Sequence, residues 1–212
     1  MVEFEQGTAK LNKFLVVAFY TVGTPYETVL ETYLMPSLEK FRIPYAIEPI
    51  PNKGSWIKNV AEKPAVIGRA LLANPAYDIV SLDADAQILE FPQLFNEIPE
   101  QYDIALHRLD WRNWYGHNTD KKEILSGTIF LRNNERTQDI VKEWHLLATH
   151  SNEWEQKCLE KVLEERKVDI FDLPLEYCYI TSLPNGDHPK VQLTNPVIIH
   201  NQVSRIYKKL IR

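Results

Sequence analysis

The run from Phe14 to Tyr20 constrains the fold more than any other segment, because it is continuously apolar. Its length and its aromatic and β-branched content are typical of a strand buried on both faces, as in a parallel sheet covered by helices. A helix start follows in Thr24-Pro25-Tyr26-Glu27, with a capping hydroxyl, a proline at the first helical position and an acid at the end of the motif. Apolar residues continue at helical spacing to Phe41, with an interruption expected at Pro36. The chain therefore begins with a central strand followed by a helix.

The alternation of strand and helix patterns recurs along the rest of the chain. The later elements are predicted at 45–48 (strand), 66–71 (helix), 79–82 (strand), 127–131 (strand), 140–148 (helix), 158–163 (helix) and 197–199 (strand). Such alternation predicts an α/β fold of Rossmann-like type, in which helices flank a central, mostly parallel sheet. The stretch 106–122 fits neither pattern, and we predict a long functional or mobile loop there.

The size and composition of the chain favour a single folded domain. A chain of 212 residues is most economically one domain, because single cores grow to about 250 residues before chains usually split. Hydrophobic residues make up 44% and charged residues 25% of it, so we expect a substantial core. The net charge of -5 gives no broad attraction to phosphate backbones, which argues against nucleic acid as a partner except through a local basic patch.

The cysteines and the apolar runs predict a cytoplasmic setting. Cys158 and Cys178 suggest neither a disulfide framework nor a zinc finger. The longest apolar run is far short of the roughly 20 residues that cross a bilayer, and Glu3 and Glu5 are unlike the start of a signal peptide. Membrane contact would be peripheral, through the basic tail at 203–212, which could equally be a solvated helix end.

Two carboxylates follow the predicted strand at 79–82 directly, in the segment Asp83-Ala84-Asp85. Ligands of open α/β sheets bind beyond the carboxyl ends of the strands, which is where these residues lie. Positions two apart in an extended chain point the same way, so both carboxylates can converge on one hard cation such as Mn²⁺ or Mg²⁺. A pair of this kind is more often a solvated turn. Its place after a buried strand favours a site, because like charges held close together require a cation or donors to compensate them.

Several segments in a fixed order resemble the A-type (GT-A) nucleotide-diphospho-sugar transferases, in particular small metal-dependent enzymes similar to glycogenin and the bacterial lipopolysaccharide glycosyltransferases. The resemblance runs from about Phe14 to about His200. The segments are Trp56 with Lys63-Pro64-Ala65-Val66-Ile67, the run Asp78 to Phe95, the run Ser126 to Asn133 followed by Trp144, then Glu155-Gln156, Leu173-Pro174 and Ile199-His200. Glu155-Gln156 stands where the family usually has Asp-Gln, so the side chain at position 155 is longer than in the family pattern.

The resemblance implies a role for each matching position. It implies a nucleotide-sugar donor, most often a UDP-sugar, a carbohydrate or other hydroxyl acceptor, a divalent Mn²⁺ or Mg²⁺ cofactor and a retaining reaction. The implied metal ligands are Asp83, Asp85 and His200; the implied catalytic residues are Lys63, Glu155 and Gln156; the implied substrate-binding residues are Tyr20, Thr21, Asp83, Ser126 and Gly127, with Trp111 and Trp114 as stacking surfaces for an acceptor. The nucleotide-binding half would span about 14–105 and the acceptor and donor-sugar half about 106–200, followed by the tail at 201–212, within one domain, 1–212.

Each assignment has a structural alternative. Asp83 could cap a turn, Asp85 could face water, His200 could be a satisfied core histidine, Lys63 could be an ordinary residue at a helix start, Tyr20 could belong to the core, Ser126 and Gly127 could end a loop, and Trp111 and Trp114 could form a patch for a partner. Glu155 completes Asn152-Glu153-Trp154-Glu155, which resembles a capping box. If the reaction inverts, it requires a carboxylate base, for which Asp110, Asp120 and Glu155 are candidates.

Two other function classes remain open from the sequence. A nucleotidyltransferase also combines an α/β sheet with carboxylates and magnesium, although no glycine-rich phosphate loop follows the first strand. A binding module that has kept the fold without turnover is the second alternative, and the glutamate at position 155 is its best argument.

Overall fold

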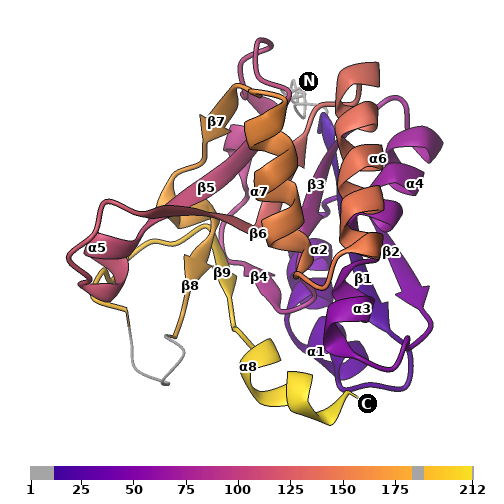
Figure 1. The fold of residues 1–212 in the computed structure, drawn as a ribbon, viewed down its shortest axis with the longest axis horizontal. Helices are drawn as coiled ribbons and strands as arrows, with labels where there is room; N and C mark the ends of the chain where they lie inside the picture. The colour runs from indigo at the N-terminus through magenta and orange to yellow at the C-terminus, as the bar shows by residue number, and fades with distance from the viewer. Residues whose placement is uncertain (1–11, 183–188, 212) are drawn as a thin grey trace, which may run out of the picture.

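The computed structural model describes residues 12–182 and 189–211, and its centre is a six-stranded sheet (Figure 1). The strand order is β2-β1-β3-β6-β5-β7. The strands are β1 (Phe14–Thr21), β2 (Tyr45–Ile50), β3 (Asp78–Leu82), β5 (Ile104–Asp110), β6 (Lys122–Leu131) and β7 (Ile170–Asp172). All of them run parallel except β6, which is antiparallel to both of its neighbours. The predicted α/β class and the mostly parallel sheet are therefore confirmed.

A second, three-stranded sheet has the order β4-β9-β8. It consists of β4 (Ala86–Ile88), β8 (Tyr179–Ile180) and β9 (Ile198–His200). In its antiparallel β4–β9 pair, Ala86 lies opposite His200, so a strand near the end of the chain runs beside the residues that follow β3. This small sheet closes one side of the candidate site.

Helices cover both faces of the main sheet. The helices of the described residues are α1 (Tyr26–Thr32), α2 (Leu34–Phe41), α3 (Trp56–Val60), α4 (Lys63–Ala73), α5 (Trp111–Tyr115), α6 (Glu135–His150), α7 (Glu155–Glu165) and α8 (Ser204–Tyr207), with short 3₁₀ turns η1 (Gln93–Asn96), η2 (Leu175–Tyr177) and η3 (Lys208–Leu210). Helices α4, α6 and α7 lie side by side on the near face in Figure 1. The break between α1 and α2 falls where Pro36 predicts it, because a proline ring clashes with the carbonyl four residues earlier, which is Thr32.

Strand β1 shows why the apolar run is central. Leu15 and Val17 pack into the core under α4, α6 and α7, whereas Phe14, Val16 and Ala18 pack into the core on the opposite face. Successive side chains of a strand point to opposite faces, so a strand covered on both sides must be apolar throughout. The edge strand β2 is less buried and contains Pro49, which an edge tolerates because one side of the strand is unpaired.

The prediction of a long loop at 106–122 is wrong. Strand β5 extends to Asp110, α5 follows at once, and β6 begins at Lys122. His107 and Arg108 interrupt the apolar pattern of β5, but its backbone pairs with β6 and β7 on either side. In the part of the chain that the structure describes, no helix is long and apolar enough to cross a membrane.

Candidate active site

A pocket of about 540 Å³ lies where β1 and β3 end, as predicted for an open α/β sheet. Its wall combines the ends of these strands, the middle of β6, the first turns of α4 and α7, strand β9 and the C-terminal segment. Of the residues that the sequence suggested for the site, the pocket is lined by Tyr20, Thr21, Lys63, Asp83, Asp85, Ser126, Gly127, Glu155, Gln156 and His200. The fold thus brings together residues from both halves of the chain.

Asp83, Asp85 and His200 form a cluster with the donor chemistry of a divalent-metal site. One ligand atom of each residue lies within 4.8 Å of the others. The β4–β9 ladder produces this arrangement, because the backbone N–H of Asn201 donates to the carbonyl of Asp85, and Ala86 lies opposite His200. Two carboxylates and an imidazole suit Mn²⁺ or Mg²⁺ better than soft ligands would.

The imidazole of His200 is held in one orientation and is only 1% exposed. Its Nε2 is hydrogen-bonded to the hydroxyl of Thr128 at 2.8 Å, and its Nδ1 lies 3.6 Å from a carboxylate oxygen of Asp85. Burial acts to lower the pKa of His200, but Cys178 and Asp85 act to raise it, and the net value is about 10. Nδ1 is buried without a hydrogen-bond partner, so a cation beside Asp85 that displaced its proton would complete its bonding. The residues present therefore fit a metal ion.

Gly127 is required for the position of this ring. A Cβ atom at position 127 would lie 2.8 Å from Cε1 and 3.0 Å from Nδ1 of His200. The sequence suggested that this glycine admits a sugar or phosphate; in the structure, the group that approaches its backbone is the imidazole.

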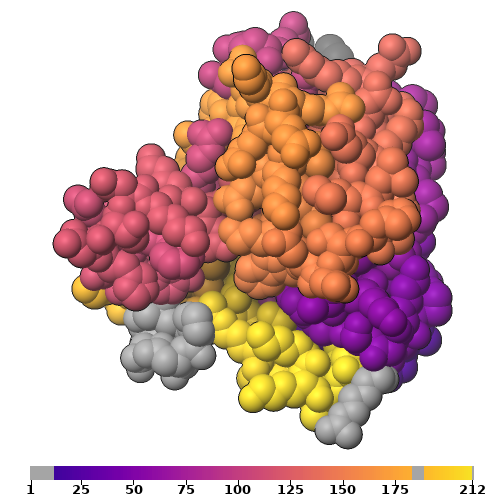
Figure 2. All heavy atoms as spheres, viewed as in Figure 1, coloured from indigo at the N-terminus to yellow at the C-terminus, as the bar shows by residue number. Residues whose placement is uncertain are grey.

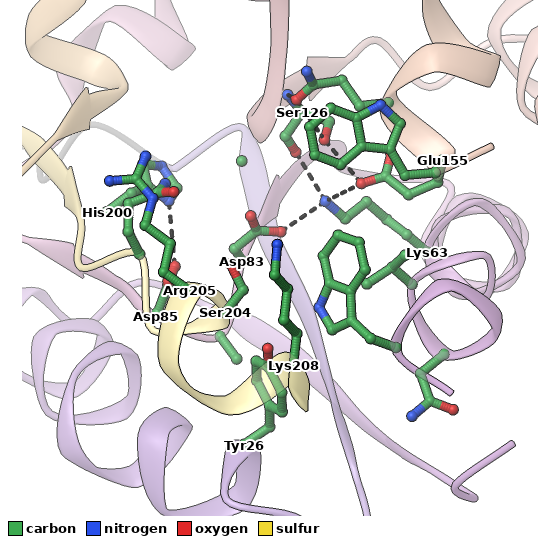
Figure 3. A pocket seen from close by; sticks show the side chains of 18 of the residues that line it. Tyr26, Lys63, Asp83, Asp85, Ser126, Glu155, His200, Ser204, Arg205 and Lys208 are labelled. Atoms are coloured by element: carbon green, nitrogen blue, oxygen red, sulfur yellow. Dashed lines mark hydrogen bonds and ion pairs between the residues drawn. The ribbon is translucent and has the colours of Figure 1, made fainter. Parts of the chain in front are cut away.

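Lys63 is almost fully enclosed in the pocket wall, at 3% exposure. Its Nζ donates to Asp83 at 2.7 Å and to the backbone carbonyl of Ser126 at 3.1 Å, and it lies 3.1 Å from Glu155 (Figure 3). An ammonium group has three donors, and these three acceptors use all of them. Burial lowers the pKa of Lys63, but the two carboxylates outweigh it and raise that pKa above its ordinary value. Lys63 therefore fixes Asp83 and Glu155 in place.

Glu155 and Gln156, at the start of α7, have different environments. Glu155 accepts a hydrogen bond from the Ser126 hydroxyl at 2.9 Å, and burial raises the pKa of its carboxyl although Lys63 opposes this. Gln156 accepts from the backbone N–H of Ser126 at 3.1 Å and donates to Glu123 at 3.0 Å. The other oxygen of Glu123 accepts from the indole of Trp111 at 2.9 Å. Glu123, which the sequence did not single out, thus sets the orientation of the Gln156 amide.

Trp111 and Trp114 do not line the pocket. Trp114 is 2% exposed and packs against Tyr179 in a small core below α5, which leaves no ring face free for stacking. Trp111 is bound to Glu123, and the Lys121 amino group covers its ring at 3.8 Å. The stacking surface expected at these two tryptophans is therefore not found, although Tyr115 of the same segment does line the pocket.

Two of the carboxylates proposed as bases, Asp110 and Asp120, also lie elsewhere. Asp110 caps α5 by accepting from the backbone N–H groups of Arg112 and Asn113, and Asp120 pairs with Arg112. Neither lines the pocket. Glu155 is the one of the three candidates that does, and Lys63 and Ser126 already engage it.

The C-terminal segment brings cations to the site that the sequence placed at a membrane or in solvent. Arg205, Lys208 and Lys209 line the pocket, and Figure 3 shows Arg205 and Lys208 pointing into it. In the space-filling view of Figure 2 this segment, in yellow, lies against the purple N-terminal part of the chain. The backbone N–H of Val203 donates to Asp85 at 2.9 Å and anchors it there. Arg212, which also belongs to the basic tail, lies outside the described residues.

Other residues of the pocket were overlooked or left without a role. They include Tyr26, Trp56, Asn59, Glu123, Trp154 and Cys178. Two local signals were available, because Tyr26 follows the end of β1 and Trp154 directly precedes Glu155. Cys178 had no such signal. It comes close to His200 only because β8 pairs with β9, and this pairing joins segments that are separate in the sequence.

Comparison with known proteins gives one family and a set of similar folds. The family model of the nucleotide-diphospho-sugar transferases matches residues 45–210. No curated protein matches the sequence significantly. A glycosyltransferase involved in the glycosylation of the major capsid of PBCV-1 superposes with a TM-score of 0.65 at 13% identity, over 91% of this chain and 95% of that one.

Two further structures show the same likeness. The glycosyltransferase GlyE of Streptococcus pneumoniae TIGR4 gives a TM-score of 0.59 at 14% identity, over 89% of this chain and 55% of that one. Mouse xyloside xylosyltransferase 1 gives 0.53 at 8% identity, over 91% and 98%. At such identities the likeness establishes the fold.

Proposed function

The chain belongs to the nucleotide-diphospho-sugar transferase family and has the GT-A fold, and we propose that it transfers a sugar from UDP to a hydroxyl group of an acceptor. The observation that carries the proposal is the convergence of Asp83, Asp85 and His200 in one pocket with the buried pair of Lys63 and Glu155. Such a site joins a candidate cation position to an enclosed, charged wall, which is the environment that a diphosphate leaving group requires.

In this proposal Asp83, Asp85 and His200 hold Mn²⁺ or Mg²⁺. The support is the grouping of their ligand atoms within 4.8 Å and the buried Nδ1 of His200, which has no hydrogen-bond partner. When bound, such a cation stabilises the negative charge that develops on a departing diphosphate.

The side chains of the protein itself supply the rest of the electrostatics. Arg205, Lys208 and Lys209 line the same pocket and place positive charge where the diphosphate would lie. Lys63 acts indirectly, by fixing Asp83 and Glu155. The clamped amide of Gln156 is proposed to contact the donor sugar, because its carbonyl and one N–H are already used by Ser126 and Glu123, which leaves one N–H free to donate.

We propose a retaining reaction. An inverting reaction would need a carboxylate base beside the acceptor hydroxyl, and Asp110 and Asp120 do not line the pocket. Glu155 is paired with Lys63 and bonded to Ser126, so it is a poor candidate for a mobile base. Glu123 also lines the pocket, but its two oxygens accept from Trp111 and Gln156, so it is a poor candidate as well. A product with the anomeric configuration of the donor, determined by NMR, is the expected result, and inversion would refute this part of the proposal.

The test of the function is release of UDP from UDP-sugars in the presence of Mn²⁺. Asp85→Asn keeps an acceptor for the Val203 N–H but removes the charge, so UDP release should fall by about 100-fold or more. Asp139→Asn is the matched control, because Asp139 is an exposed aspartate paired with Lys142 on the surface. Full activity in Asp85→Asn, or in excess chelator, would contradict the proposal. Pyrophosphate release from UTP and a sugar phosphate would instead identify a nucleotidyltransferase.

A further inference from the structure

Two tryptophans, Trp56 and Trp154, form part of the pocket wall. Trp56 begins α3 and is half-buried, and Trp154 directly precedes α7 and is 41% exposed. Their ring centroids lie 6.3 Å apart, with an angle of 59° between the ring planes. Nζ of Lys208 lies 5.9 Å from the centroid of the Trp56 ring. The two indoles thus make an open aromatic corner at the pocket.

The position of this corner connects it to the proposed reaction. Trp154 is the residue before Glu155, whose carboxylate lies 3.1 Å from Nζ of Lys63, and α3 ends just before α4, which begins at Lys63. The apolar surface therefore adjoins the charged centre. Binding pockets for small molecules combine such aromatic walls with a few convergent polar groups.

The exposure of Trp154 is not explained by the core of the protein. A large indole gains free energy by burial, and the three core clusters of the described residues do not include Trp154 or Trp56. Single exposed apolar residues are common on protein surfaces and need no explanation. An exposed indole in the wall of a ligand pocket differs from them, because a molecule bound in the pocket can contact it.

We propose that the acceptor is a carbohydrate and that it packs against Trp56 and Trp154. The inference rests on the proposed function, in that it names the acceptor class for the same site. At an angle of 59° the two indoles cannot clamp a flat base between parallel faces. A pyranose can instead lay an apolar C–H face on one indole while its hydroxyls remain free to bond polar groups of the pocket. This acceptor surface, formed by Trp56 and Trp154, replaces the one expected at Trp111 and Trp114.

The first experiment measures acceptor binding without any donor. Saturation-transfer NMR is run on the purified protein with methyl glucoside, methyl galactoside, methyl mannoside, methyl xyloside, maltose and lactose as probes. At least one probe should bind the wild-type protein, with the strongest transfer to C–H protons of one ring face. Trp154→Ala should weaken that binding by about tenfold or more, which corresponds to about 1.4 kcal/mol.

Two variants serve as controls for the binding experiment. Trp154→Phe keeps an aromatic face and should restore most of the affinity. Tyr45→Ala removes an exposed aromatic ring of β2 that does not line the pocket, and it should bind like the wild type. Absence of binding by every probe, or equal binding by Trp154→Ala and the wild type, would overturn the inference.

The second experiment uses turnover and separates this inference from the proposed function. With the best probe as acceptor, Trp56→Ala and Trp154→Ala should raise its KM by about tenfold or more and change kcat much less. If the wild-type protein transfers sugar and the KM values of both variants are unchanged, the acceptor surface at Trp56 and Trp154 is refuted and the proposed function stands. If the wild-type protein releases no UDP but still binds saccharides in a Trp154-dependent way, the proposed function fails and the inference of saccharide binding at the tryptophans is retained.

Discussion

Replacing Lys63 by methionine should destabilise the protein in a way that depends on pH. Methionine keeps most of the aliphatic stem of Lys63 and removes the amino group that bonds Asp83, Glu155 and the carbonyl of Ser126. Removing one partner of a buried ion pair typically costs about 3–5 kcal/mol, because the other charge remains buried and unpaired. Asp83 can turn to solvent, since its side chain is 40% exposed, so the cost falls mainly on Glu155.

The protonation of Glu155 sets the magnitude. Its ordinary pKa is 4.5, and without Lys63 the carboxyl will take up a proton on folding. At about 1.36 kcal/mol per pH unit, that uptake costs about 3.4 kcal/mol at pH 7 and about 0.8 kcal/mol at pH 5. In Lys63→Met the pKa of Glu155 is higher in the folded than in the unfolded state. The free energy of unfolding is therefore least affected below the unfolded pKa, and it falls as pH rises toward the folded pKa.

The assay is urea unfolding at pH 5 and pH 7. The stability difference between wild type and Lys63→Met should grow by as much as about 2.6 kcal/mol from the lower to the higher pH. Any slope that the wild-type protein shows reduces this figure, because burial already raises the pKa of Glu155 there. In the double variant Lys63→Met/Glu155→Gln the titrating carboxyl is gone, so the added pH dependence should disappear. Lys142→Met, on the surface of α6, should change stability by about 0.5 kcal/mol or less at either pH.

A loss of stability in Lys63→Met that is the same at both pH values would refute the reasoning, since it would mean that Glu155 does not bear the unpaired charge. A loss below about 1 kcal/mol at pH 7 would refute it as well, because the pair would then be worth no more than a surface ion pair.

Three further outcomes are expected. Gly127→Ala should displace His200 and lower Mn²⁺ affinity by about tenfold or more, measured by calorimetry, with unchanged Mn²⁺ affinity as the contrary result. Glu123→Ala should lower the kcat of UDP-sugar turnover, because it releases the Gln156 amide. Glu123→Gln can still accept that hydrogen bond and should retain a higher kcat than Glu123→Ala. Equal rates in the two variants would show that the contact does not position Gln156. Asp78→Ala should cost about 1–3 kcal/mol in urea unfolding and leave the KM for UDP-sugar unchanged, because Asp78 bonds the backbone and side chain of the segment after β6 and does not line the pocket; a raised KM would give it a role at the site.

Local patterns were sufficient to predict the α/β class and the strand that ends before Asp83. The apolar run of β1 and the proline that interrupts the first helix are determined by residues close together in the chain, so spacing alone identifies them. His200 was suggested by the family resemblance and supported by its place directly after an apolar stretch. Its role at the site depends on the pairing of β4 with β9, for which the sequence has no direct signal apart from family resemblance.

The segment 104–122 was misjudged because its structure depends on distant partners. Strand β5 contains His107, whose ring bonds the carbonyl of Leu173, and its pairing with β7 joins residues far apart in the sequence. Trp114 is buried by Tyr179 from the second sheet. Composition correctly indicated that such aromatic residues matter there, but only tertiary packing decides whether they face a ligand or a core.

The meeting of Asp85 and His200 across β4 and β9 also has a consequence for chain entropy. A cation shared by these side chains would tie together two points separated by more than half of the chain. Closing a loop of that length costs chain entropy, so the two ligands meet only when the chain folds, and the cation binds the folded state alone. A ligand present at 100 times its dissociation constant adds about 2.7 kcal/mol to the free energy of unfolding. Occupancy of the pocket by a cation would therefore raise the free energy of unfolding of the whole protein. Mn²⁺ alone, without nucleotide, should raise the melting temperature.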